Sequence, residues 1–209
     1  MKSTPFDFLG NLDTLIAVII GAVLATGGAL VADVIQDRLG RKRRARDAAR
    51  FFGEVLYSID QLTAIAVRSL NIGDNRWGSV TQRMFRAALQ EASIYERNRE
   101  RIFDINDARL RQRIHRYVLS TTIPMVALLE YSNDLVALEG QTGEETESRR
   151  KECTENREGA LEAVLEHRPE NRAIISALEK IAGVEIDLLE PVDQRSDIRE
   201  TQPPANADS

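Results

Sequence analysis

The amino-acid sequence predicts an all-α protein: an N-terminal transmembrane helix that continues into a cytoplasmic antiparallel four- or five-helix bundle. Three observations lead to this prediction. Residues 15–34 form one unbroken apolar run, apolar residues recur at helical spacing through most of the remaining chain, and no alternating strand pattern is sustained. Aromatic residues account for only 5% of the 209 residues, and good helix formers are abundant.

The apolar run LIAVIIGAVLATGGALVADV contains one hydroxyl side chain, Thr26, and one charged side chain, Asp33. Some twenty residues at about 1.5 Å rise cover the ~30 Å hydrocarbon core of a bilayer. Its large apolar residues favour insertion by roughly 4 kcal/mol, and Asp33 opposes this by less than about 3 kcal/mol because it lies near one end. We therefore expect a transmembrane helix over residues 14–35. A cleaved signal peptide is the alternative, but it would need a shorter apolar core and preceding basic residues.

The charges flanking this run predict its orientation. Residues 1–13 form a short segment with little net charge, whereas residues 36–50 form a strongly basic juxtamembrane stalk. Because basic residues stay in the cytoplasm, we expect a single-pass protein of the inner (cytoplasmic) membrane, with an extracytoplasmic N-terminus and a cytoplasmic C-terminus. The side chains expected to contact anionic lipid headgroups are Arg38, Arg41, Lys42, Arg43, Arg44 and Arg46.

Small residues recur along one face of the predicted span, at steps of three or four residues. Such a face lets a second helix approach closely, which is how helices associate within lipid. The sequence therefore predicts packing between spans and a homo-oligomer. The residues on this face are Ala17, Gly21, Ala25, Gly28 and Ala32.

The expected bundle covers residues 51–190 and begins with the continuation of the membrane helix. Nothing from Thr14 to Leu70 requires a break, and the turn formers at 71–75 follow. A second helix is expected over 79–103. A third is expected over 108–137, with Asn106 or Asp107 as its N-cap and a kink at Pro124.

The C-terminal third of the chain is more polar. Residues 140–158 are interpreted as a loop leading into a solvated helix that ends at His167, with Cys153 exposed on it. Pro169 predicts a boundary, because the residue before a proline is disfavoured in helical geometry. A last helix is expected over 170–189, followed by a disordered tail over 191–209.

Composition and missing motifs restrict the possible chemistry. A net charge of −5 argues against general nucleic-acid binding, and the presence of only one cysteine and two histidines argues against a zinc site. The sequence contains no phosphate-binding loop, nucleophile elbow or nucleotide fingerprint. We expect no metal and no cofactor. The expected partners are anionic lipids, a second copy of the chain and an unidentified cytoplasmic protein.

One segment suggests chemistry. Arg109 and His115 stand six positions apart in RLRQRIH, which resembles the ribonuclease motif of HEPN-domain proteins, a family of helical bundles. The resemblance implies that His115 acts as acid or base at an RNA 2′-hydroxyl and that Arg109 stabilises phosphate charge. The other interpretation, which the adjacent apolar stripe favours, is a half-buried structural histidine. The seven arginines from Arg97 to Arg116 alternate with acidic residues, which is typical of a solvated, salt-bridged face.

A second resemblance rests on IYERN at 94–98 and IHRY at 114–117. This pattern is similar to one in small, uncharacterised bacterial single-pass proteins with a helical cytoplasmic domain, and it implies no activity. In such a domain Tyr95 and Tyr117 would pack between the second and third helices, and Asn98 would bond to the turn at 104–107.

Three functions are compatible with these features. The first is a membrane-anchored interaction, scaffold or sensing module, which the absence of a catalytic signature favours. The second is a membrane-tethered HEPN-like ribonuclease. The third is a pore-forming defence effector, although the span has almost no polar face to line a channel.

Overall fold

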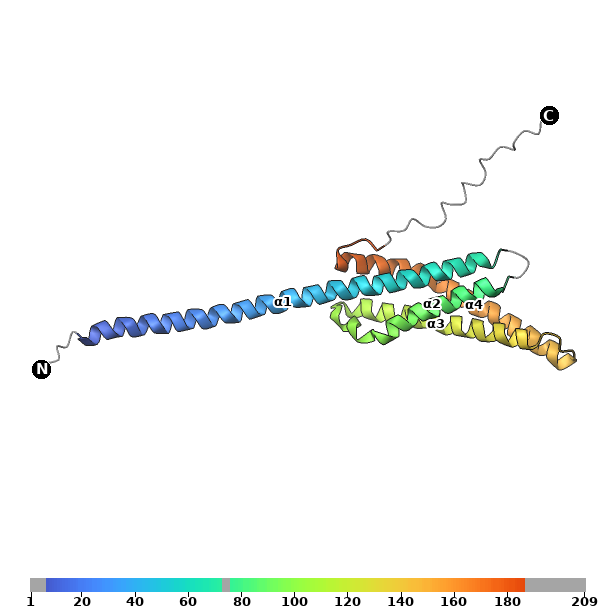
Figure 1. The fold of residues 1–209 in the computed structure, drawn as a ribbon, viewed down its shortest axis with the longest axis horizontal. Coiled ribbons are helices and arrows are strands. Elements are labelled where there is room, and N and C mark those ends of the chain that lie inside the picture. The colour runs from blue at the N-terminus through green and yellow to red at the C-terminus, as the bar shows by residue number, and fades with distance from the viewer. Residues whose placement is uncertain (1–6, 73–75, 187–209) are drawn as a thin grey trace, which may run out of the picture. The chain divides into compact units, whose positions relative to one another are not determined.

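The computed structural model describes residues 7–72 and 76–186, with side chains from Ile16 onward. Within these residues the chain is helical and contains no strand, which confirms the all-α prediction. Five elements follow one another (Figure 1): α1 (Asp7–Ser69), α2 (Ser79–Arg97), the 3₁₀ helix η1 (Arg99–Asp104), α3 (Ala108–Ala137) and α4 (Glu144–Ala182). The chain divides into two compact units, Met1–Ala45 and Arg46–Ser209, each described by itself below.

Unit 1 holds the N-terminal part of α1. Its most apolar 18-residue window has a mean hydropathy of 2.2, and none of that window is buried. Among the described helices, this is the one long and apolar enough to cross a membrane. The predicted uninterrupted helix is confirmed, because α1 continues to Ser69. The ends of the chain at 1–6 and 187–209, including most of the predicted tail, lie outside the described residues.

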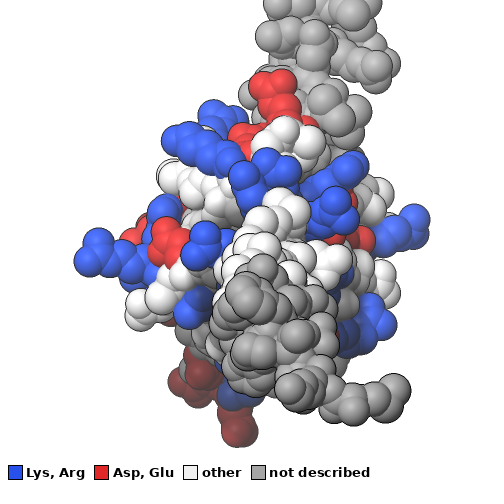
Figure 2. All heavy atoms as spheres, turned by 90° about the vertical axis from the view of Figure 1, so that its left-hand side faces the viewer, with Lys and Arg blue, Asp and Glu red and all other residues white. Residues whose placement is uncertain are grey.

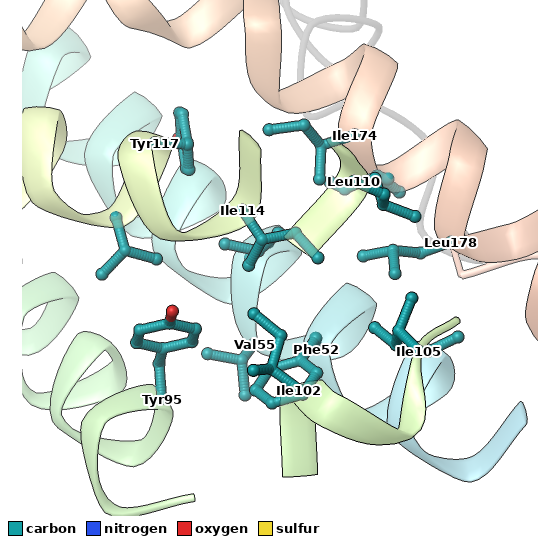
Figure 3. Close-up of a cluster of buried hydrophobic side chains, with 14 of the residues drawn as sticks. Phe52, Val55, Tyr95, Ile102, Ile105, Leu110, Ile114, Tyr117, Ile174 and Leu178 are labelled. Atoms are coloured by element: carbon teal, nitrogen blue, oxygen red, sulfur yellow. The ribbon is translucent and has the colours of Figure 1, made fainter. Parts of the chain in front are cut away.

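Unit 2 is built around two clusters of buried apolar side chains. The first joins residues of α1, α2, η1, α3 and α4, and Figure 3 labels ten of them, whose side chains converge from these elements. The second cluster includes Trp77 and Phe85 together with Met125 and Val164. Burial of apolar area is the main force that holds such helices together. The predicted burial of the two tyrosines is confirmed: Tyr95 is 0% and Tyr117 is 1% exposed.

The predicted third helix is confirmed at both ends, Ala108 and Ala137. Asp107 caps it, since one carboxylate oxygen accepts from the backbone N–H groups of Arg109 (2.9 Å) and Leu110 (3.0 Å). These two N–H groups have no partner within the helix, so the cap satisfies them. Pro124 lies inside α3, which continues on both sides of it.

The expected second helix over 79–103 is wrong at its C-terminal end. The α-helix ends at Arg97, and a 3₁₀ helix covers Arg99–Asp104. Asn98 marks the change: its side chain donates to the Ile94 carbonyl (2.8 Å), and its backbone N–H donates to the Tyr95 carbonyl (3.1 Å). This side-chain bond replaces the predicted one to the turn at 104–107. Asparagine competes in this way for backbone groups and so favours helix ends.

The predicted boundary at Arg168–Pro169 is also wrong, because α4 continues through it from Glu144 to Ala182. Proline removes only one helical N–H, and Pro169 is exposed, where its ring has room. Contacts on both sides hold the helix to α1: Arg168 bonds Asp60, and Asn171 donates to the Leu56 carbonyl. Tertiary contacts therefore outweigh the local preference.

The expectation that Cys153 is exposed is wrong as well. This side chain is 1% exposed and lies on the same side of α4 as the buried Leu161 and Val164. The sequence around Cys153 is so polar that the one buried face of this part of α4 is not recognisable from composition. We assign the thiol a packing role, since buried structural cysteines are inert.

Candidate functional site

The small residues predicted to pack between spans all lie on α1 in unit 1. Ala17, Gly21, Ala25, Gly28 and Ala32 are exposed. A methyl group added at Gly21 or Gly28 would meet no atom within 4 Å among the described residues. The face is therefore open along its length, as a surface for a second helix must be.

The hydroxyl of Thr26, in the middle of the same stretch, donates to the carbonyl of Ala22 at 2.8 Å. Its polar group is satisfied inside its own helix. This stretch of α1 thus presents an apolar surface to its surroundings, which is what a lipid-embedded helix needs.

The predicted headgroup-binding side chains occupy the next part of the chain. Arg41 pairs with Asp37 at 2.8 Å, one helical turn away, with both side chains 57% exposed. The remaining basic residues of this block, Arg38, Lys42, Arg43, Arg44 and Arg46, are likewise exposed. Exposed ion pairs contribute little to stability, so such pairing does not prevent these exposed side chains from meeting an anionic surface.

The structure gives His115 a different arginine partner from the one in the motif. Its Nε2 lies 3.3 Å from Nη2 of Arg99, and its Nδ1 lies 3.0 Å from the hydroxyl of Tyr95. The guanidinium of Arg109 makes no hydrogen bond with His115 among the described residues, and Arg109 is exposed at the start of α3. The ring of His115 also stacks on that of Tyr95, with centroids 6.2 Å apart.

These two contacts select one form of the imidazole. A guanidinium can only donate, so Nε2 must accept and Nδ1 carries the proton that it donates to the Tyr95 oxygen. Tyr95 is buried, and desolvation is the main reason its pKa is raised to about 12, with Glu96 raising it further and Arg99 lowering it. His115 therefore supplies a hydrogen bond to a buried hydroxyl, as the structural interpretation of His115 expects.

The arginines on either side of His115 in the sequence contact acidic side chains, a backbone carbonyl and an aromatic ring. The face seen in Figure 2 likewise carries basic side chains with acidic ones among them. Glu170 on α4 accepts from Arg116 (3.0 Å) and Arg113 (3.4 Å). Burial favours the neutral carboxyl, but the two guanidinium groups outweigh it and lower the pKa of Glu170. Arg111 donates to the Ile105 carbonyl at 2.6 Å, and Arg101 lies 4.5 Å above the ring of Phe51. Several of these arginines are thus engaged in holding η1 and the start of α3.

A polar groove between α1 and α4 was not recognised in the sequence. Arg168 donates to both carboxylate oxygens of Asp60, at 2.8 and 3.2 Å, and both side chains are less than one-third exposed. The hydrogen bond that Arg168 donates to Asp60 is the main reason that the pKa of Arg168 is raised despite burial. The one signal in the sequence is that Asp60 is the only charged residue between Glu54 and Arg68 of the predicted helix.

The tyrosine predicted to pack between helices stands beside this pair. Burial raises the pKa of Tyr117, and the negative charge of Asp60 raises it further, while the positive charge of Arg168 lowers it. Asn171, which is 1% exposed, donates to the Leu56 carbonyl at 3.1 Å. Polar groups of α1, α3 and α4 therefore meet inside unit 2 at the level of Pro169.

The outer face of α3 carries an exposed apolar stripe. Leu119, Ile123 and Val126 are 39%, 64% and 42% exposed, at spacings of four and three residues. Arg116 and Glu130 lie on the same face at its two ends, and both are exposed. A 4-3 spacing of apolar residues is the pattern with which one helix packs against another.

In the part of the chain that the structure describes, no group of three or more His, Cys, Asp or Glu side chains could hold a metal ion. No protein-family model, curated protein or solved structure matches this chain.

Proposed function

We propose that this protein is a single-pass, membrane-anchored interaction module that self-associates and holds an antiparallel helical bundle on the cytoplasmic side of the inner membrane. The observation that carries the proposal is the wholly exposed apolar stretch of α1, followed directly by the basic block. An exposed apolar surface of this length is stable in lipid and not in water. Its flanking arginines favour the cytoplasmic side for the rest of the chain.

Self-association is supported by two surfaces on different parts of the chain. The open small-residue face suits close packing of two spans. The stripe of Leu119, Ile123 and Val126 suits packing of two α3 helices, and its 4-3 spacing with Ile and Leu favours two parallel strands. Neither surface is extensive. Confinement to one membrane raises the effective concentration of the copies. Weak contacts then give stable association, and no additional contacts are needed.

The two alternatives have less support. A wide aqueous pore needs polar groups facing its lumen, whereas the hydroxyl of Thr26 is bonded within its own helix. A HEPN-like ribonuclease requires Arg109 and His115 to act together, and the nitrogens of His115 are engaged by Arg99 and Tyr95. The ribonuclease interpretation stays a prediction.

Disulfide crosslinking in native membranes tests the proposal. Cys153 is first replaced by alanine, and a cysteine is then placed at Ile123 on the stripe or at Gln90, an exposed polar position on α2. Mild oxidation should give a dimer with Ile123→Cys and little with Gln90→Cys. A dimer band of equal strength at both positions, or monomer alone at every oxidant dose, would contradict self-association through α3.

A further inference from the structure

One large apolar side chain of unit 2 is directed into solvent. Phe103 in η1 is 74% exposed, the highest value for any large apolar residue that the structure describes, those of the apolar stretch of α1 included. Its neighbours Ile102 and Ile105 are buried in the first apolar cluster. Turning the ring of Phe103 inward would expose these two side chains, so the short helix holds an aromatic ring at the surface.

The 3₁₀ helix η1 lies at the end of unit 2 where α1 enters it. The guanidinium of Arg101 lies 4.5 Å from the centroid of the Phe51 ring. Ile102 belongs to the same cluster of buried side chains as Phe52 (Figure 3). Phe103 is therefore carried by the end of unit 2 that is nearest along α1 to the basic block.

This end of unit 2 is tethered close to the predicted membrane span. Unit 2 begins at Arg46, so residues 36–45 are all that separates it from the span predicted over 14–35. Ten helical residues extend about 15 Å, and the headgroup layer covers about 5 Å of that distance. Membrane helices commonly tilt by about 20°, which lowers one side of an attached domain toward the bilayer.

The surface around Phe103 is basic. Residues 97–116 contain seven arginines and three acidic residues, a net charge of +4 in a chain whose net charge is −5. Glu170 on α4 pairs with two of these arginines, which still leaves a positive region. Arg111 lies 5.8 Å from the centroid of the Phe103 ring, and Arg109 is exposed. An exposed aromatic ring among basic side chains is the combination with which interfacial segments bind anionic bilayers.

We propose that Phe103 and the arginines beside it form a docking surface for the anionic membrane in which α1 is anchored. The ring inserts at the level of the headgroups, and Arg109 and Arg111 contact lipid phosphates. The basic residues at 38–46 meet the same surface, so lipid contacts continue from the span to η1. This inference rests on the proposed membrane anchorage, and its test separates the failure of one from the failure of the other.

Tryptophan fluorescence of the full-length protein in vesicles tests the docking surface. The test position is Phe103→Trp. Val23→Trp in the apolar stretch is the positive control, and Val136→Trp, exposed and about 40 Å along α3 from Arg109, is the negative control. The vesicles contain phosphatidylcholine and phosphatidylglycerol, with or without bromine on the acyl chains, because bromine quenches tryptophan only at short range. The unsubstituted protein supplies the emission of Trp77, its one tryptophan, for subtraction.

We expect brominated lipid to lower the added emission of Phe103→Trp by about half and to leave that of Val136→Trp unchanged. Vesicles without phosphatidylglycerol should reduce the quenching of Phe103→Trp about twofold and leave that of Val23→Trp unchanged. Quenching of Phe103→Trp no stronger than that of Val136→Trp, with Val23→Trp quenched, would overturn the docking surface alone. Absence of quenching at Val23→Trp as well would overturn the membrane anchor on which the docking surface rests.

Reversing one charge tests the part played by the arginines. Adding Arg109→Glu to Phe103→Trp should reduce its quenching about twofold, because the carboxylate repels anionic lipid. Arg149→Glu, which changes an exposed arginine on α4, should leave the quenching unchanged. Circular dichroism checks that both variants stay helical. Equal quenching with Arg109→Glu and Arg149→Glu would contradict a lipid contact of Arg109.

Discussion

Arg168 and Asp60 are 108 positions apart in the sequence, and the guanidinium of Arg168 makes two hydrogen bonds, of 2.8 and 3.2 Å, to the Asp60 carboxylate. The pair connects α1 to α4 directly before Pro169. Its side chains are 29% and 26% exposed, so water screens the charges only in part. A long-range pair of this geometry holds together the two helices that form the groove.

Removing one partner of this pair should destabilise unit 2. We expect Asp60→Ala to lower the free energy of unfolding by about 1–2 kcal/mol, less than for a fully buried pair and more than for a surface pair. Thermal unfolding in micelles, followed by circular dichroism, measures the loss. The control is Arg50→Gln, which breaks an exposed pair with Glu54 one turn away and should cost no more than about 0.5 kcal/mol. Equal losses in the two variants would contradict the structural role of Asp60.

The stabilisation from the ion pairs of Glu170 with Arg113 and Arg116 on α3 should depend on pH. Because its two arginine partners lower its pKa in the folded protein, Glu170 contributes stability that is present above its unfolded pKa and is lost as the pH falls through the folded value. The difference in melting temperature between the wild type and Glu170→Gln should therefore be largest near pH 6 and shrink below about pH 4. A difference that grows on acidification would show that the carboxylate is not the stabilising form.

Replacing Pro169 tests the continuity of α4. Proline inside a helix costs up to about 3 kcal/mol relative to alanine, and Pro169 is exposed, so alanine meets no steric obstacle. We expect Pro169→Ala to raise the free energy of unfolding by about 1 kcal/mol. Thermal unfolding gives the value. A lower stability would indicate that the proline shapes contacts between α4 and α1 that alanine cannot keep.

Substitution of His115 distinguishes a structural role of this residue from a role in a ribonuclease site. His115→Ala removes the partner of the buried Tyr95 hydroxyl and should lower stability by about 1 kcal/mol while leaving RNA turnover in cells unchanged. Arg109→Ala should change neither property, because this side chain is exposed. RNA decay or toxicity that disappears in both variants, with the helical content intact, would favour the HEPN-like activity instead.

Local signals in the sequence predicted much of the fold. The long apolar run and the sustained helical spacing predicted α1, and an aspartate cap followed by a regular apolar stripe predicted both ends of α3. Each of these features acts within a few residues along the chain. The same reasoning failed at Pro169, where contacts with Asp60 and Leu56 on α1 keep the helix continuous.

The candidate groove was not predictable for the same physical reason. Asp60, Arg168 and Asn171 come together only when α1 and α4 pack, and none of them belongs to a local motif. The pairing of His115 with Arg99 is similar, since the turn at Asn98 and η1 brings these residues together. The exposed stripe on α3 became distinguishable from the core only once the exposure of each side chain was known.

The central claim is that the apolar part of α1 lies in the inner membrane with the rest of the chain in the cytoplasm. The most direct measurement is a pair of C-terminal fusions to the full-length chain, one to alkaline phosphatase and one to a fluorescent protein that matures only in the cytoplasm. We predict a fluorescent fusion that stays in the membrane pellet after alkaline carbonate extraction, and an inactive phosphatase fusion. An active phosphatase, or a fluorescent fusion released into the soluble fraction, would contradict the account.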